Sequence, residues 1–83
     1  MGNLEQVKDQ IRQFIVETTY APIEQVQNET LIFVEGIFDS MGFISLINFV
    51  EETFAFKVKD IELLEENFES INAIARYIES KLN

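Results

Sequence analysis

The sequence predicts an all-α fold: a small antiparallel four-helix bundle, with three longer helices, one short helix and a long first loop. Residues that break helices are scarce, since the 83 residues include only 3 Gly and 1 Pro. Apolar residues recur at spacings of three and four, which is typical of amphipathic helices. Hydrophobic residues make up 47% of the chain and include 8 Phe, enough for one small core. We therefore expect residues 1–83 to form a single domain.

The first helix is expected to begin at Asn3, a good N-cap, with Gln6 three residues later as in a capping box. It should end near Thr18, because β-branched residues and Pro22 follow. Its apolar residues fall within an arc of about 100° on a helical wheel: they are Leu4, Val7, Ile11, Phe14 and Ile15.

Residues 19–38 show no clear period, and a loop of this length is unusual in a compact domain and often functional. Its apolar content indicates that it packs on the core. A strand at residues 31–34 is the alternative local interpretation, although no second convincing strand is present to pair with it. The apolar residues of the loop are Ile23, Val26, Leu31, Ile32, Phe33, Val34, Ile37 and Phe38.

The second helix is expected to begin at Asp39 or Ser40. Its inward face repeats at helical spacing and consists of Phe43, Leu46, Ile47, Val50 and Phe54.

The last third of the chain predicts two more helices. A short connector, residues 55–59, leads to Asp60, the predicted N-cap of a brief third helix that carries Ile61 and Leu64. Ser70 then caps the last helix, whose apolar face is Ile71, Ile74, Ala75, Ile78 and Leu82. These elements complete the bundle.

The residue types exclude several chemistries. The chain contains no Cys and no His. A disulfide framework, a thiolate nucleophile and a zinc site of the Cys/His type are therefore impossible. The usual proton-transfer residue at neutral pH is missing as well, so we do not expect an enzyme.

The charge of the chain also restricts its partners. With 6 basic against 15 acidic residues, the net charge is −9, which argues against nucleic acid and anionic membrane surfaces. We expect partners with basic surfaces. Apolar runs such as residues 31–34 are too short to span a bilayer, and the N-terminal sequence lacks a signal pattern. We therefore expect a monomer in the cytoplasm.

The segment Gly36-Ile37-Phe38-Asp39-Ser40-Met41 carries the most information. Asp39 would cap the second helix, with Ser40 at its first position and the hydroxyl at the rim. A helix N-terminus carries unpaired donors and partial positive charge, so a phosphate ester on Ser40 would lie in a favourable field. From the dipeptide alone, an ordinary Asp-Ser cap is the more frequent explanation.

In this setting the sequence resembles the acyl carrier protein family, over essentially the whole chain. That family attaches a 4′-phosphopantetheine arm to the Ser of an Asp-Ser-Leu or Asp-Ser-Met motif, which Asp39-Ser40-Met41 matches. Glu51, Glu52 and Phe54 follow at the offsets seen in the family. The Asp-Ser-Met-Gly run is most similar to discrete carriers such as D-alanyl carrier proteins. Gly42 and Ser45 stand where many members have acidic residues.

The resemblance implies a carrier and not a catalyst. A phosphopantetheinyl transferase would load the arm from coenzyme A onto Ser40, and the arm's thiol would hold an acyl or aminoacyl group as a thioester. A loading ligase and downstream transferases of fatty acid, polyketide or related lipid and secondary metabolism would be the partners. An aminoacyl carrier, including a D-alanyl carrier, is the alternative cargo class. The sequence leaves open whether the core opens to hold a fatty chain or whether Phe residues fill that space.

The second helix also predicts a docking surface. Residues that point away from its inward face form an apolar spot beside carboxylates, which suits transient docking on basic enzymes. Burial of Met41 and Ile44 under the long loop is the competing interpretation. The predicted partner-binding residues are Met41, Ile44, Asn48, Glu51 and Glu52.

Two other classes of protein are compatible with the composition. A non-enzymatic acidic helical interaction module would explain charge and helicity but leaves Asp39-Ser40-Met41 to chance. A paired-carboxylate hydrolase is compatible by residue type, but a bundle this small offers little room for a substrate cleft.

Overall fold

The computed structural model describes residues 4–82 and, over that range, contains four α-helices and no strand. The all-α prediction is therefore confirmed. Two short 3₁₀ helices lie in the connections. The elements are α1 (Leu4–Thr19), η1 (Ile23–Gln25), α2 (Ser40–Phe54), η2 (Asp60–Glu62), α3 (Glu65–Phe68) and α4 (Ile71–Leu82). None of the helices in this part of the chain is long and apolar enough to cross a membrane.

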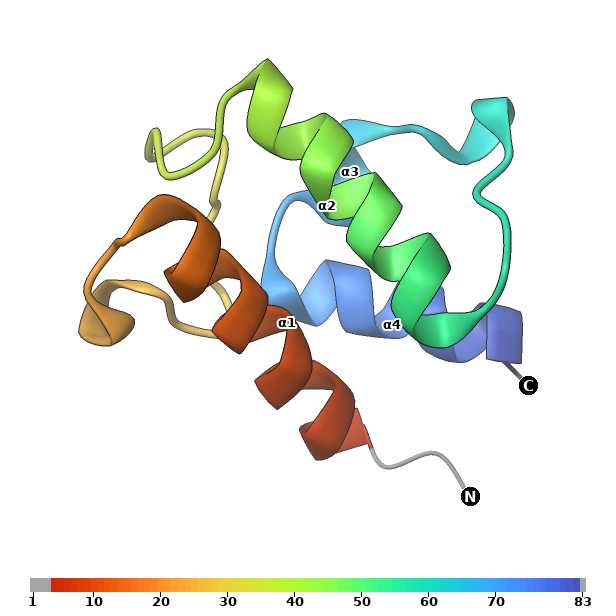
Figure 1. Cartoon of the computed structure of the whole chain (residues 1–83), viewed down its shortest axis with the longest axis horizontal. Coiled ribbons are helices and arrows are strands. Elements are labelled where there is room, and N and C mark those ends of the chain that lie inside the picture. Colours follow the sequence, from red (N-terminus) through yellow and green to blue (C-terminus); the bar gives the residue numbers. More distant parts are fainter. Residues whose placement is uncertain (1–3, 83) are drawn as a thin grey trace.

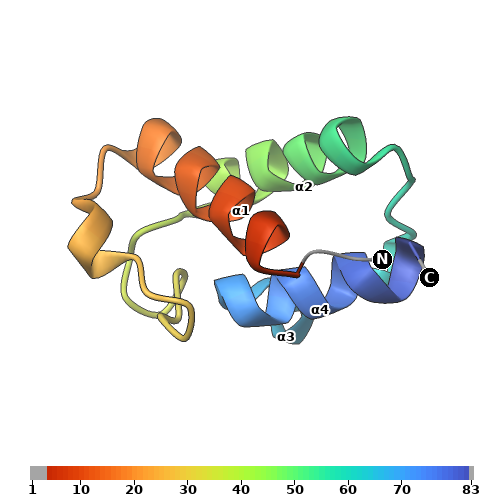
Figure 2. The ribbon, with the colours of Figure 1, turned by 90° about the horizontal axis from the view of Figure 1, so that it is seen from below.

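The helices form two layers (Figure 2), with α1 and α2 on one side and α3 and α4 on the other. α1 and α2 run in opposite directions (Figure 1), and the long loop joins the end of α1 to the start of α2. α1 contacts both α2 and α4, and α3 contacts α4. The start of α2 therefore lies at the end of the bundle where the long loop turns.

The core lies between these layers and uses the predicted helical faces. Ile11 and Ile15 of α1 and Leu46 and Val50 of α2 have no solvent exposure. The rest of the α1 and α2 stripes is half-buried and packs against the same core. The cap predicted for α1 at Asn3 falls outside the described residues. α1 ends at Thr19, one residue beyond the predicted Thr18.

α4 supplies the largest part of the core. The Ser70 hydroxyl accepts a hydrogen bond from the Ala73 amide at 3.2 Å, which confirms the predicted cap. Leu82 continues the apolar face of α4 at helical spacing, as predicted, but its side chain is 54% exposed and adds little to the core. The fully buried members of the α4 face are Ile71, Ile74, Ala75 and Ile78.

The long loop contributes only some of its apolar side chains to the core. It forms a turn in the segment for which a strand was the alternative prediction. Val26, Ile32 and Phe38 are buried, whereas Ile23 and Val34 are 54% and 70% exposed. Residues 32–36 form hydrogen-bonded turns, because the Glu35 amide bonds to the Leu31 carbonyl at 2.9 Å. A continuous strand would need a partner for its backbone groups, and the turn satisfies them locally.

The brief third helix begins later than predicted. Asp60 lies inside the single turn of η2 and is not an N-cap; α3 starts at Glu65 instead. Ile61 and Leu64 are 81% and 48% exposed, so neither anchors a helix on the core. The anchor is Phe68, whose side chain is completely buried.

Candidate functional site

The first turn of α2 is fixed by the side chain that precedes it. The Asp39 carboxylate accepts a hydrogen bond from the Gly42 amide at 2.9 Å. Asp39 itself has extended backbone geometry, which is usual for an N-cap. The helix begins at Ser40, as predicted.

Ser40 is exposed to solvent at the first position of α2. Ser40 therefore lies at the surface of the bundle, at the N-terminal end of α2. Because α2 has 15 residues, its N-terminus carries the partial positive charge of an aligned peptide dipole. A phosphodiester attached to Ser40 would lie in that field.

The approach to α2 is held by the loop. The buried Ile32 carbonyl accepts hydrogen bonds from the Ile37 and Phe38 amides, each at 2.9 Å. The Ile32 amide donates to the Glu69 carbonyl at 2.9 Å, which ties the loop to the segment before α4. Gly36 has φ +77°, a conformation that glycine adopts without strain. The loop therefore presents Asp39 and Ser40 from a well-bonded turn.

An open pocket of about 330 Å³ lies directly beside Ser40. Its apolar lining comes from three separate parts of the chain: Phe33 of the loop, Phe43 of α2 and Leu63 after η2. Glu65, in the first turn of α3, completes the lining. A flexible, partly apolar group attached to Ser40 would find this surface within immediate reach.

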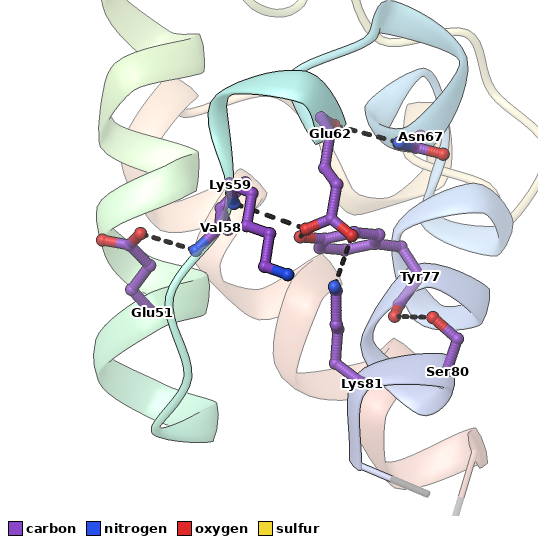
Figure 3. A network of polar contacts seen from close by, with 8 residues as sticks. All are labelled: Glu51, Val58, Lys59, Glu62, Asn67, Tyr77, Ser80 and Lys81. Carbon is purple, nitrogen blue, oxygen red and sulfur yellow. Dashed lines mark hydrogen bonds and ion pairs between the residues drawn. The ribbon is translucent and has the colours of Figure 1, made fainter.

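Glu62, the residue before the pocket-lining Leu63, is tied to α4 (Figure 3). The Glu62 carboxylate accepts hydrogen bonds from the Tyr77 hydroxyl at 2.9 Å and from the Lys59 amide at 3.3 Å. It also forms an ion pair with Lys81. The Glu62 carbonyl accepts from the Asn67 side chain at 2.9 Å, which links η2 to α3.

These contacts shift the ionisation of both groups. The hydrogen bond from Lys81, supported by those from Tyr77 and Lys59, holds the pKa of Glu62 below its usual value, although burial acts in the opposite direction. Burial raises the pKa of Tyr77, and the bond to the Glu62 carboxylate raises it further. At neutral pH the pair is therefore a phenol donating to a carboxylate.

The residues predicted as a partner surface lie on α2, and most of them are available. Met41 and Ile44 are 72% and 57% exposed, so they do not pack under the loop. Asn48 and Glu52 are exposed as well. Glu51 differs, because its half-buried carboxylate accepts the Val58 amide at 2.8 Å. That bond holds the connector after α2 against the helix.

Four residues that line the pocket are outside the predicted set of site residues: Phe33, Phe43, Leu63 and Glu65. Phe43 follows Ser40 by three residues on α2, a helical spacing, but the sequence assigns it only to the inward face. The other three come from the loop, from the segment after η2 and from α3, so no spacing in the sequence connects them with Ser40. For these three residues, the one signal in the sequence is the apolar character of Phe33, which lies in a loop predicted to pack on the core.

A small helical bundle that exposes a serine at a capped helix start, beside a partly apolar pocket, has the geometry to hold a covalently attached group at its surface. Comparison with protein families agrees: the family model described as the phosphopantetheine attachment site matches residues 9–78. The chain belongs to this family of phosphopantetheine-binding carriers, and the prosthetic group of the family is covalently attached 4′-phosphopantetheine. A search of curated proteins finds no significant match.

Membership of the family has consequences for partners. Carrier domains of this kind interact with a phosphopantetheinyl transferase and with the enzymes that use the loaded arm. They are generally carriers and not catalysts.

Proposed function

We propose that Ser40 is the attachment site of the 4′-phosphopantetheine arm and that the protein carries an acyl or aminoacyl group between biosynthetic enzymes. The supporting observation is the Ser40 hydroxyl, exposed at the first residue of a helix capped by Asp39 and inside the region that matches the family. When bound, the arm supplies a thiol that holds the cargo as a thioester.

Loading requires only a nucleophilic oxygen from this chain. The Ser40 oxygen forms a bond to the phosphorus of coenzyme A that bears the pantetheine. The pyrophosphate bond breaks, and adenosine 3′,5′-bisphosphate leaves. The hydroxyl proton passes to a base of the transferase. Asp39 contributes by holding the first turn of α2 through the Gly42 amide, which fixes the backbone that carries Ser40.

The residues around Ser40 suit the arm. Phe33, Phe43 and Leu63 offer apolar contact for its alkyl parts beside the attachment point. The α2 N-terminus favours the negative charge of the phosphodiester. The chain needs no group of its own to perform chemistry on the cargo, which is consistent with its lack of His and Cys.

The exposed face of α2 is the proposed docking surface for loading ligases and downstream transferases. Met41 and Ile44 provide an apolar contact, and Asn48 and Glu52 extend it along the helix. A net charge of −9 favours encounter with basic enzyme surfaces. Glu51 contributes less to this surface, because the Val58 amide already occupies its carboxylate. Fatty acid, polyketide or related pathways, or aminoacyl transfer such as D-alanyl transfer, are the proposed settings.

The attachment can be tested by mass spectrometry of the intact protein. Incubation with coenzyme A and a transferase of broad specificity should add the mass of one phosphopantetheine arm to the wild type and none to Ser40→Ala. Ser45→Ala is the matched control, since Ser45 is another exposed serine on α2, and it should be loaded like the wild type. An unloaded wild type, or a loaded Ser40→Ala variant, would refute the proposal.

A further inference from the structure

We infer that this carrier does not take a long acyl chain into its bundle through the pocket beside Ser40, because the rings of Phe33 and Phe43 line that pocket and continue into a packed row of aromatic side chains behind it. This inference depends on the proposed attachment at Ser40. It goes further by limiting the length of cargo that the bundle encloses and by naming the side chains that set this limit.

The first argument is the size of the pocket. At about 330 Å³, it lies at the lower end of the range of roughly 300–1,000 Å³ that holds one small-molecule ligand. The arm is attached at Ser40, on the lining itself, so any part of the arm that folds into the pocket leaves less space for the cargo. A long alkyl chain would need further volume behind the pocket.

The second argument is what lies behind the pocket. The Phe43 ring contacts Phe33 edge to face, with centroids 5.5 Å apart, and contacts Phe68 in the same way at 5.6 Å. Phe68 in turn packs against Tyr77 at 5.1 Å. Phe68 is completely buried and Tyr77 is 7% exposed. A continuous row of rings therefore runs from the pocket into the core, and a chain could enter only by separating these edge-to-face pairs.

The third argument is that the segment next to Leu63 is held in place. Leu63 and Glu65 line the pocket, and the neighbouring Glu62 is joined to α4 through the Tyr77 hydroxyl and Lys81 (Figure 3). These bonds hold the segment that precedes Leu63 and Glu65 against α4 and so resist widening of the pocket on this side. The exposed carboxylate of Glu65 at the pocket also disfavours burial of an alkyl tail next to it.

The test compares cargo of increasing length on the intact protein. A promiscuous transferase and the corresponding acyl derivatives of coenzyme A can load acetyl, butyryl, octanoyl and dodecanoyl arms, with each product verified by intact mass. The midpoint of thermal unfolding is then measured by calorimetry. Each methylene buried in the core would raise the midpoint by about 3–6 °C in a domain of this size. We expect the midpoint to change by less than one such increment, or to fall, between butyryl and dodecanoyl.

Variants of the rings test the cause. Phe43→Leu and Phe33→Ala remove ring volume at the pocket, and each should show a rising midpoint with chain length relative to its own acetyl form. Two variants are used so that failure of one to fold leaves the other. Phe49→Ala is the matched control: Phe49 is a half-buried ring on α2 that stacks on Phe14 of α1, with centroids 4.3 Å apart. Its length profile should be as flat as that of the wild type.

The outcomes separate this inference from the proposed function. A wild type that gains no mass at Ser40 overturns the attachment and the length limit together. A wild type that is loaded, and whose midpoint climbs with every added methylene, overturns the length limit and leaves the attachment intact. Flat profiles in both pocket variants would overturn the role assigned to Phe33 and Phe43.

Discussion

Replacing Gly42 with alanine is expected to destabilise the protein, although the same change stabilises most helices. An alanine in place of glycine restricts the unfolded chain and gains about 0.5–1 kcal/mol in an ordinary helical position. At Gly42, however, an added Cβ would lie 2.9 Å from Cε1 and 3.1 Å from Cγ of Phe38, and closer still to Cδ1.

The Phe38 ring has little freedom to move away. It is 4% exposed and contacts Phe14 at 6.3 Å and Phe33 at 6.0 Å between centroids. Inserting a methyl group into such packing costs about 1–3 kcal/mol. The cost exceeds the gain, and we expect a net loss of about 1 kcal/mol, which lowers the unfolding midpoint by about 4–8 °C.

Calorimetry of a double-mutant cycle checks this explanation. Gly42→Ala should cost less in a Phe38→Leu background, because the smaller side chain leaves room for the new methyl group. Ser45→Ala, at an exposed position one turn further along α2, should be neutral or slightly stabilising and serves as the control. A midpoint for Gly42→Ala at or above that of the wild type would refute the close packing of α2 on Phe38.

Three further predictions concern the cap, the Glu62 cluster and the net charge. Asp39→Ala should lower the free energy of unfolding by about 0.5–2 kcal/mol through loss of the cap, and it should slow loading. Asp39→Asn should retain stability, because asparagine is also a good N-cap. An Asp39→Ala variant with wild-type stability and loading would contradict the cap. The partners of Glu62, of which Lys81 has the largest effect, lower its pKa in the folded protein from the usual 4.5. This carboxylate therefore stabilises the fold fully above pH 4.5. The contribution is lost as the pH falls through the folded-state pKa. The difference in unfolding midpoint between the wild type and Glu62→Gln should therefore shrink on acidification below that pH, and a difference independent of pH would show that the cluster is not the cause. The midpoint should also rise with ionic strength, since salt screens repulsion in a chain of net charge −9; a midpoint unaffected by salt would argue against this repulsion.

The elements with strong local signals could be predicted from the sequence. Asp39 and Ser70 each accept an amide from the first turn of the helix that follows, which is the contact that their position suggested. Ile11, Leu46 and Ile74 are buried because the helical period alone decides which face they occupy.

The rest depends on contacts between distant residues. Phe49 has no place on the core stripe of α2, and its partner, Phe14, lies on another helix. Glu62 meets Tyr77 across a separation of 15 residues, for which no spacing rule exists. The brief helix predicted to follow Asp60 lies instead at Glu65–Phe68. Asp60 belongs to a single 3₁₀ turn, and burial of Phe68 fixes the position of α3.

The environments of the two tyrosines give the protein an internal optical label. The chain has no Trp and only 2 Tyr. Tyr20 is 88% exposed, whereas Tyr77 is packed against Phe56 and Phe68 and bonded to Glu62. A near-ultraviolet circular dichroism signal requires fixed aromatic packing, so the tyrosine band arises mainly from Tyr77. Any change in the packing around Tyr77 during loading or docking can therefore be followed in the unlabelled protein.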